Sequence, residues 1–477
     1  MPAPRLSLLD SYDLDLIHER TLEVLERVGV VFRSAEARKA LAEAGCLIYD
    51  ETELVRFPAD LVDAIVRRSR PPVLLAGRDP SRDALLDGST TYSATGGICP
   101  HIVDLDSGLY RQPSVNDLAQ AVRLADALDP LGIVWYSLSP TVGVEPELVD
   151  LTALACMLGN TGKHIMGQIV RPAELPYALE MLRCCSGSPL AERPIFSAIY
   201  CPVAPLQHEA APVDAAMGMV AAGIPIDIYS LALSGATAPM TLAGTIVQTN
   251  CEVLSAVILL RLVAPDCPLI YSASAGIMDM RTSRSAYATP EVLLMDAAMT
   301  ELAHWYGLPA LSVGNAGEAE GLGFRAGVED MALALQGRLS RPDLLVGLAM
   351  VESGRALSLQ KMVLDAEIVE QLDRFMVGIA LDEESLALAA ITEVGPGGHY
   401  LGLKQTRQAL RSGEHWLPRV LYRTPPERLH GGGADELELA RLRVLSLLAE
   451  HDPAPLPDGA AEELAAILER ARRELTI

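Results

Sequence analysis

The stretch Pro225-Ile-Asp-Ile-Tyr-Ser230 leads through Leu-Ala-Leu-Ser-Gly-Ala-Thr-Ala-Pro239 into an apolar run that continues to Leu260. Its first part is a short apolar segment that predicts a buried strand. The small residues around Gly235 predict a turn that brings backbone N–H groups near the surface. Pro239 suits the first turn of a helix, where its missing N–H is no loss. The stretch therefore predicts one unit of strand, loop and largely buried helix.

The same unit recurs along the chain from Ser89 onward. Apolar runs predict eight strands, at 90–94, 133–137, 164–167, 195–200, 226–230, 269–272, 310–313 and 344–348. A helical pattern follows each run, at 114–128, 147–158, 172–184, 213–222, 241–263, 290–306, 327–339 and 358–375. Strict alternation of this kind predicts an α/β protein with a (β/α)8 TIM barrel. A doubly wound open sheet is the alternative, but no Gly-x-Gly-x-x-Gly follows the first strand.

The barrel is expected to occupy residues 89–380, with a further segment on either side. Residues 1–88 are expected to form an N-terminal helical cap, with helices at 11–28, 34–45 and 58–70. Residues 381–477 are expected to form a C-terminal helical extension packed on the barrel. The cap shows no chemistry of its own, so we assign it to packing or to an oligomer surface. We expect a homo-oligomer.

The composition narrows the class of protein. The chain has 477 residues, half of them apolar, with 62 acidic against 38 basic residues and a net charge of −24. Such an acidic surface argues against nucleic acid and membranes as partners. No signal peptide or apolar run of membrane-spanning length is found. The eight scattered cysteines form no Cys-x-x-Cys pair and predict reduced thiols, so we expect a cytoplasmic protein.

Aromatic residues are few, at 4% of the chain, yet several fall at or near predicted strand ends. The active site of a TIM barrel lies where its strands end. Ring faces that converge there would suit a quaternary ammonium ion, although the same rings could simply fill the top layer of the barrel. The aromatic residues in question are Tyr92, Trp135, Tyr136, Tyr200, Tyr229 and Tyr271.

Charged residues in the predicted loops offer further candidates. Glu318 and Glu352 could complement a cation. Arg281 could pair with Asp279 across its loop or hold a substrate carboxylate. The histidines are dispersed and form no metal-ligand pattern, so no directly bound metal is expected. A Schiff-base lyase is disfavoured because only Lys163 adjoins a predicted strand, at its start.

Taken together, these features resemble the trimethylamine methyltransferase (MttB-like) family over nearly the whole chain. Several short segments carry the resemblance and are specific as a set. They are Arg27-Val-Gly-Val30, Arg56-Phe-Pro58, Gly77-Arg-Asp79, Gly96-Gly97 with Asp104-x-x-Ser-Gly108, Ser234-Gly-Ala-Thr-Ala-Pro239 with Asn250-x-Glu252, Asp279-Met-Arg-Thr282, Glu352-Ser-Gly354, Asp365-x-Glu367 and Glu393-Val-Gly-Pro-Gly-Gly-His399.

The resemblance implies a barrel that transfers a methyl group from an amine to the cobalt of a corrinoid (cobalamin) carried by a separate protein. Members that act on trimethylamine carry pyrrolysine in the barrel mouth. This chain has only standard residues, and its 314–320 loop departs from the usual pattern. It therefore resembles the pyrrolysine-free branch, which demethylates quaternary amines such as glycine betaine. A quaternary nitrogen is already a cationic leaving group, so cobalt(I) can attack its methyl carbon without a proton transfer.

We therefore expect a methyltransferase with a glycine betaine-like quaternary amine as donor and a corrinoid protein as partner. Glu352 and Tyr271 are the expected catalytic residues, and Gly96, Gly97 and Gly235 are expected to contact the cofactor. The expected substrate-binding residues are Tyr92, Trp135, Tyr200, Tyr229, Gln168, Asn315, Arg281 and His399. Two alternatives remain, a sensor barrel that binds quaternary amines without turnover and a methyltransferase for a tertiary methylamine.

Overall fold

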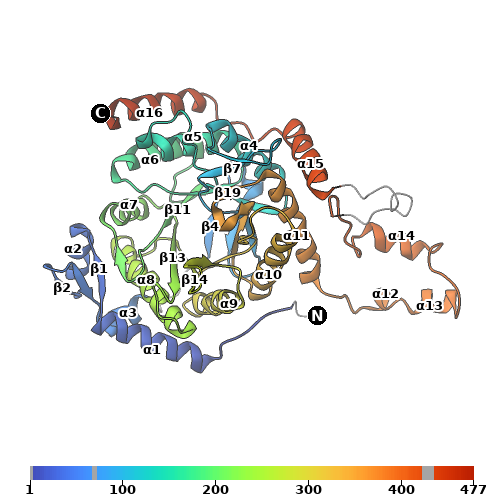
Figure 1. Ribbon diagram of the computed structural model, residues 1–477, viewed down its shortest axis with the longest axis horizontal. Helices are drawn as coiled ribbons and strands as arrows, with labels where there is room; N and C mark the ends of the chain where they lie inside the picture. The colour runs from blue at the N-terminus through green and yellow to red at the C-terminus, as the bar shows by residue number, and fades with distance from the viewer. Residues whose placement is uncertain (1–3, 67–71, 422–434, 477) are drawn as a thin grey trace.

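A closed barrel of eight parallel strands forms the centre of the protein, whose computed structural model describes residues 4–66, 72–421 and 435–476 (Figure 1). Neighbouring strands pair in chain order, and the last strand pairs with the first, so no edge is left open. The predicted (β/α)8 barrel is confirmed. Its strands are β6 (Tyr92–Thr95), β9 (Leu131–Trp135), β10 (His164–Gly167), β11 (Phe196–Tyr200), β13 (Ile226–Ser234), β14 (Leu269–Asp279), β16 (Ala310–Val313) and β17 (Leu344–Leu348).

A helix follows each strand and covers the outside of the barrel (Figure 1). The helices begin and end close to the predicted residues, and two of them have N-caps encoded locally, at Ser114 and Ser358. Ser114, for example, accepts a hydrogen bond from the Asp117 N–H and forms a capping box with it. The helices are α4 (Val115–Ala127), α5 (Val149–Asn160), α6 (Leu175–Ser186), α7 (Ala210–Ala221), α8 (Leu242–Val263), α9 (Pro290–Trp305), α10 (Phe324–Ser340) and α11 (Leu359–Val377).

Two neighbouring strands extend further than the sequence indicated. β13 and β14 stay paired with each other as far as Ser234 and Ile277. β14 then pairs antiparallel with β15 (Arg284–Ala286). Most of the segment from Ser272 to Arg281, which we expected to be a loop, is therefore strand. Small buried residues allow this, because they let the two strands continue side by side above the rest of the barrel.

Residues 4–66 of the N-terminal segment lie on the flank of the barrel and not over its mouth (Figure 1). The three predicted helices are present as α1 (Ser11–Arg27), α2 (Ala35–Glu43) and α3 (Ala59–Val66). The end predicted for the third helix, at residue 70, lies outside the described residues. The segment also contains strands that were not predicted. β1 (Val30–Phe32), β2 (Leu47–Tyr49) and β3 (Leu54–Arg56) form a small sheet with β12 (Gln207–His208) from a barrel loop.

A hairpin lies across the amino-terminal end of the barrel. It consists of β4 (Val73–Leu75) and β5 (Ala84–Leu86), which pair antiparallel. The Ala76 N–H donates to the carbonyl of Pro194, which immediately precedes strand residues of β11, at 3.1 Å. The ring of His164, at the start of β10, hydrogen bonds to the Ala76 carbonyl at 3.0 Å. The hairpin therefore closes the end of the barrel at which the strands begin, opposite to their carboxyl ends.

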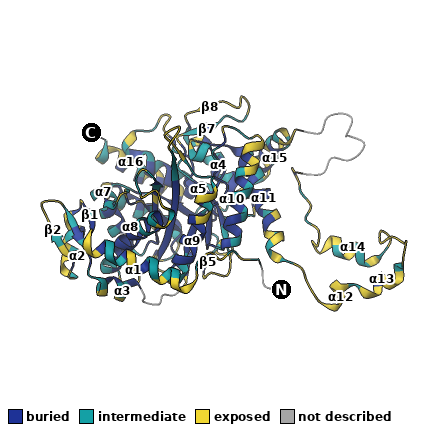
Figure 2. Ribbon diagram, turned by 60° about the horizontal axis from the view of Figure 1, so that its bottom comes forward, coloured by how far each residue is buried: buried dark blue, intermediate teal, exposed yellow. Residues whose placement is uncertain are grey.

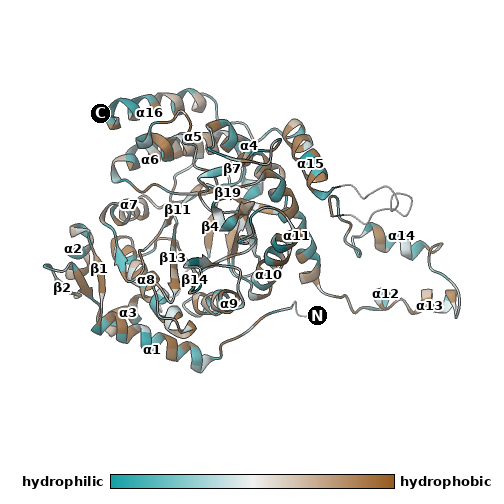
Figure 3. Cartoon of the chain, in the orientation of Figure 1, coloured by the Kyte–Doolittle hydropathy of each residue, from teal (hydrophilic) through white to brown (hydrophobic). Residues whose placement is uncertain are grey.

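Helix α8 lies between the barrel and the N-terminal segment. It packs on β13 and β14 on one side and on α1, α2 and α3 on the other. Among the described helices it alone is long and apolar enough to span a membrane, but 78% of that apolar window is buried within the fold. Its composition is therefore that of a core helix. Helix α1 alternates hydrophobic and hydrophilic residues in Figure 3, as expected of a helix with one face on α8.

The C-terminal segment divides into two parts. Helices α15 (Glu436–Glu450) and α16 (Ala460–Leu475) pack on the barrel helices, α15 against α4 and α11 and α16 against α6. Helices α12 (Glu383–Leu386), α13 (Leu388–Val394) and α14 (Lys404–Arg411) instead project away from the barrel (Figure 2). Neither α12 nor α14 contains a buried residue. The predicted packing of the whole extension on the barrel is therefore wrong for this projecting arm.

The seam between the first and last strands depends on two glycines. A Cβ atom on Gly96 would lie 2.4 Å from both the N and Cα atoms of Gly347. The pairing of β17 with β6 shifts register nearby, between Leu345 and Leu348. The two backbones therefore approach more closely than any side chain at Gly96 allows.

We expect Gly96→Ala to lower the free energy of unfolding by about 1–3 kcal/mol, because backbone atoms must move to admit the methyl group. Denaturant titration would measure the change. The matched control is Gly159→Ala in α5, where a Cβ meets no atom within 4 Å. The control should leave stability unchanged or raise it by up to about 1 kcal/mol. Equal stabilities for the two variants would contradict the account of the seam.

Candidate active site

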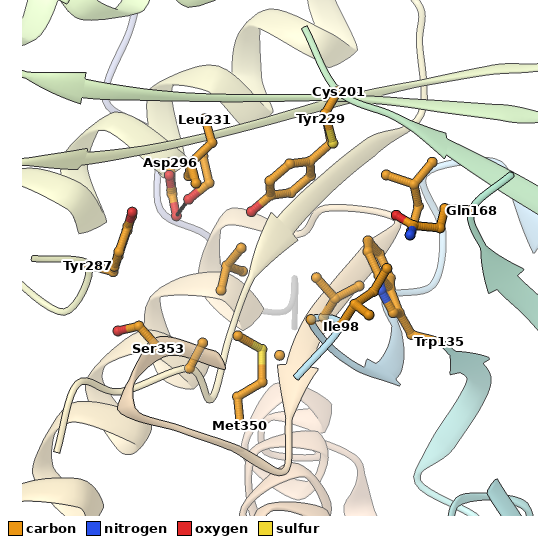
Figure 4. A pocket seen from close by; sticks show the side chains of 17 residues that line it. Ile98, Trp135, Gln168, Cys201, Tyr229, Leu231, Tyr287, Asp296, Met350 and Ser353 are labelled. Atoms are coloured by element: carbon orange, nitrogen blue, oxygen red, sulfur yellow. Dashed lines mark hydrogen bonds between the residues drawn. The ribbon is translucent and has the colours of Figure 1, made fainter. Parts of the chain in front are cut away.

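A cavity of about 320 Å³ lies inside the barrel at the carboxyl ends of the strands (Figure 4). Active sites of TIM barrels occupy this end because the loops that follow the strands meet there. Residues from most of the strands and from α9 line it. They are Gly97, Ile98, Trp135, Gln168, Ile199, Cys201, Tyr229, Leu231, Ser274, Tyr287, Asp296, Val313, Ala316, Val346, Gly347, Met350 and Ser353.

Three aromatic rings contribute to the cavity wall. Trp135 is the last residue of β9, Tyr229 lies in β13, and Tyr287 follows β15. Trp135 is buried, and its Nε1 has no hydrogen-bond partner among the described residues. Most of the remaining wall is aliphatic. The cavity is therefore an apolar space with aromatic faces, which suits a cation that has no hydrogen to donate.

The one carboxyl group in the wall belongs to Asp296, which projects from α9 (Figure 4). Its side chain is 1% exposed, and one oxygen accepts a long hydrogen bond of 3.5 Å from Ser274. The other oxygen, Oδ1, has no partner among the described residues. Burial raises the pKa of this carboxyl to about 8, and the nearby Ala275 backbone and Ser274 hydroxyl lower it by less. The group is therefore mostly protonated at neutral pH when the cavity is empty.

Sequence reasoning missed Asp296 because it lies within a helix and not in a loop that follows a strand. A signal was present, since the residue interrupts an apolar stretch of α9 in which Met295, Ala297, Ala298 and Met299 are all buried. An acidic side chain on the buried face of a helix is costly unless it is neutral or paired. Tyr287, Cys201 and Met350 were also missed as cavity residues.

A hydrogen-bond network holds Tyr287 at the cavity. The Glu318 carboxylate accepts the backbone N–H groups of Tyr287 and Ala288, the latter at 2.8 Å. The Glu318 N–H in turn donates to Glu329 at 2.7 Å. Glu318, which we considered as a partner for a cation, therefore has a positioning role.

A buried ionic cluster supports the loop that carries Ala316. The Lys361 ammonium lies 2.8 Å from Asp365, 2.9 Å from Asp330 and 2.9 Å from the carbonyl of Asn315. Asp330 also accepts the Gly317 N–H at 3.0 Å. The cluster is fully within the protein, so its charges are paired where water cannot reach them. It fixes the loop between β16 and α10 against the cavity.

Four of the predicted site residues line the cavity, namely Trp135, Tyr229, Gln168 and Gly97. Four of the six aromatic candidates, Tyr92, Tyr136, Tyr200 and Tyr271, do not. Tyr92 is the first residue of β6, at the opposite end of the barrel, where its hydroxyl accepts the Leu85 N–H at 3.2 Å. Tyr136 is buried but does not line the cavity.

Tyr200 and Tyr271 point outward, into the layer between strands and helices. The Tyr200 hydroxyl contacts Nδ1 of His208 at 2.6 Å, and the Tyr271 hydroxyl donates to Asn250 at 3.0 Å. Ile199 and Cys201, on either side of Tyr200, face inward instead, as does Ser274 three residues after Tyr271. Side chains of a strand alternate between its two faces, so a shift of one residue reverses the prediction. The expected catalytic role of Tyr271 is therefore not supported by its position.

The expected polar residues also lie outside the cavity wall. Glu352 pairs with Arg355 at 3.2 Å and borders an adjoining cavity, which shares Ser353 with the first. Arg281 is 90% exposed and pairs with Asp279 at 3.3 Å. Asn315 is buried behind Ala316, and neither of its side-chain polar atoms has a partner among the described residues.

The remaining predicted residues have structural positions. His399 is exposed on the projecting arm, because the turn after α13 lies away from the barrel. Gly96 faces the backbone of Gly347 at the seam. Gly235 has φ +86°, and a Cβ there would lie 2.6 Å from Cε of Met280. In the part of the chain that the structure describes, no group of three or more His, Cys, Asp or Glu side chains is arranged to hold a metal ion.

Comparisons with known proteins show the family and agree with the barrel fold. The family model described as trimethylamine methyltransferase (MTTB) matches residues 1–476. A trimethylamine methyltransferase MttB of Desulfitobacterium hafniense is 30% identical over 97% of this chain and 93% of its own length. A glycine betaine methyltransferase of the same species is 25% identical over 99% and 98%. The crystal structure of the Methanosarcina barkeri monomethylamine methyltransferase matches with a TM-score of 0.50, 12% identity and coverage of 99% and 95%. The chain belongs to the trimethylamine methyltransferase (MttB) family.

The raised pKa of Asp296 predicts a pH-dependent cost to stability. The unfolded carboxyl ionises near pH 4, whereas the folded one holds its proton up to about pH 8. Between these values the folded state binds more protons, so the free energy of unfolding falls as pH rises. Asp296→Asn removes this dependence. We expect its stability relative to the wild type to rise with pH, by at most about 1.4 kcal/mol per pH unit.

Denaturant titrations at several pH values between 4 and 8 would measure this difference. The carboxyls of Asp227 and Asp365, whose pKa burial raises to about 7, are present in both proteins and cancel from it. Asp15→Asn, at an exposed position in α1, is the control and should follow the wild type at every pH. Parallel curves for Asp296→Asn and the wild type would show that Asp296 ionises normally.

Proposed function

We propose that this protein transfers a methyl group from a quaternary methylated amine to the cobalt(I) of a corrinoid that a separate protein carries. The observation that carries the proposal is the cavity at the strand ends, where Trp135, Tyr229 and Tyr287 surround an apolar space with one buried carboxyl, Asp296. Membership of the family supports methyl transfer. The names of the relatives, for trimethylamine and glycine betaine, support a methylated amine as donor.

The cavity can hold a quaternary ammonium without hydrogen bonds to it. Its positive charge is spread over the methyl groups, which attract the negative faces of Trp135, Tyr229 and Tyr287. The aliphatic wall excludes water, so this attraction and the field of Asp296 act at low dielectric. The chain itself therefore contributes position and electrostatics, which is what a direct displacement requires.

The corrinoid, when docked, supplies the cobalt(I) electron pair that forms the new bond to the methyl carbon. The electron pair of the broken C–N bond stays on nitrogen, so the amine leaves neutral and no proton moves. The chain must then leave one methyl group exposed at the mouth of the cavity while the rings hold the others.

Exposed apolar side chains near the end of β13 support a flat macrocycle as the partner. Leu231, which lines the cavity, is 41% exposed, and Met240 and Met280 nearby are 67% and 55% exposed. Gly235 packs against Met280 without a side chain between them. The rim is therefore apolar and has little bulk at this point. These residues would meet the face of the corrinoid, whereas Gly96 would not.

We expect purified protein, mixed with reduced cobalamin and a set of quaternary amines, to form methylcobalamin, which absorbance would follow. Trp135→Leu should lower kcat/KM by about 2- to 30-fold, the effect of losing about 0.5–2 kcal/mol of cation–π attraction. Tyr12→Leu, which removes an aromatic side chain 71% exposed in α1, is the control and should change nothing.

Failure to methylate cobalamin with every quaternary amine would refute the transferase proposal. Binding of these amines without turnover, also in the presence of a corrinoid protein, would instead identify the barrel as a sensor. Activity that Trp135→Leu leaves intact would refute the role of the aromatic wall.

A further inference from the structure

We propose that the cavity selects quaternary ammonium ions that carry no carboxylate, such as tetramethylammonium or a hydroxyalkyl trimethylammonium, and that Asp296 is the residue that sets this choice. The inference rests on the proposed function and narrows its substrate class. It departs from the glycine betaine-like donor that the sequence suggested. Three features of the described residues carry it.

The first feature is the unpartnered oxygen of Asp296. The side chain is 1% exposed, lines the cavity and leaves Oδ1 without a hydrogen-bond donor. A buried polar atom without a partner is costly, so a ligand that satisfies it gains more than one that does not. A quaternary ammonium meets this need as a counter-charge. The ammonium group favours the ionised form of Asp296, so a carboxylate on the same substrate would face a second negative charge and be repelled.

The second feature is the absence of a positive group from the cavity wall. No lysine, arginine or histidine is among the described residues that line it. The polar side chains that do line it, apart from Asp296, are neutral, such as Gln168, Ser274 and Ser353. These groups suit a hydroxyl group or no polar group at all. A carboxylate is normally bound by a guanidinium or an ammonium.

The third feature is the charge of the adjoining cavity at the mouth. Its lining contains two arginines and four acids, namely Arg284, Arg325, Asp279, Glu318, Glu320 and Glu352. Both arginines are paired, Arg284 with Glu320 at 3.6 Å and Arg325 with Glu329 at 2.6 Å. Arg281, the expected carboxylate anchor, points to solvent and pairs with Asp279. The entrance therefore attracts cations and offers a carboxylate no unengaged arginine.

Binding of a cation should also release a proton. Asp296 holds its proton in the empty cavity, and an opposite charge nearby favours the ionised form. The titratable groups that line the cavity with it are the Tyr229 and Tyr287 phenols and the Cys201 thiol. Burial raises the pKa of Tyr229 above its usual range and that of Cys201 to about 12, so neither supplies the proton near pH 7.

Isothermal titration calorimetry on the full chain without corrinoid would test the inference. The probes are tetramethylammonium, choline and glycine betaine at pH 7, in two buffers of different ionisation enthalpy. We expect the first two to bind about tenfold or more tightly than glycine betaine, with release of nearly one proton. Asp296→Asn should weaken choline binding about tenfold and abolish proton release. Asp15→Asn is the control and should behave as the wild type.

Glycine betaine that binds as tightly as choline would overturn the inference, as would choline binding that is unchanged in Asp296→Asn. If Asp296→Asn does not fold, proton release by the wild type decides, and its absence overturns the inference. Methyl transfer from glycine betaine in preference to choline would overturn it while leaving the proposed function intact. Failure of methyl transfer from every quaternary amine, with selective choline binding, would refute the proposed function alone.

Discussion

The pairing of β6 with β17 is the constraint on which the rest of the structure depends. These strands are the first and last of the barrel, and the whole of its sequence lies between them. Their backbones come together at Gly96 and Gly347, where no side chain fits between them. Closure at this point gives the cavity its wall of Gly97 and Gly347 and brings the loop after β17 beside the loop after β6. The site exists only in the closed ring.

The chemistry of the cavity depends on the shielding of its side chains from solvent by the barrel. Asp296 is shielded from solvent, and its burial raises the pKa of the carboxyl to about 8. The same shielding makes the faces of Trp135 and Tyr229 effective partners for a cation. Farther out, at the exposed rim of Leu231, Met240 and Met280, the surface becomes apolar and open. The proposed cation would thus bind inside, and the proposed corrinoid would meet the apolar rim outside.

The sequence was sufficient to predict the eight strands and their helices because hydrophobic periodicity and caps are local properties. The sequence was not sufficient to predict which face of each strand points into the barrel. Tyr200 and Tyr271 lie close in the sequence to cavity residues, yet their side chains point away from the cavity. The face that a side chain takes depends on the register of its strand, which only the closed sheet determines. Trp135 and Tyr229, in contrast, do line the cavity. Asp296 interrupts an apolar stretch of α9, but its place at the cavity could be found only from the fold, because tertiary packing brings the helix there. The hydrophobic pattern likewise predicted helices but not their contacts, so it did not indicate the projecting arm.

Helix α8 has a consequence for how the chain is made. Its apolar surface is covered on one side by α1, α2 and α3, which precede it in the sequence by the length of four barrel strands and their helices. Because a ribosome synthesises the chain from its N-terminus, these covering helices have already emerged when α8 appears. A segment with the hydropathy of a membrane span thus meets its protein partners as soon as it leaves the exit tunnel. The order of the elements along the chain shortens the time during which this surface is open to chaperones, to membranes and to aggregation.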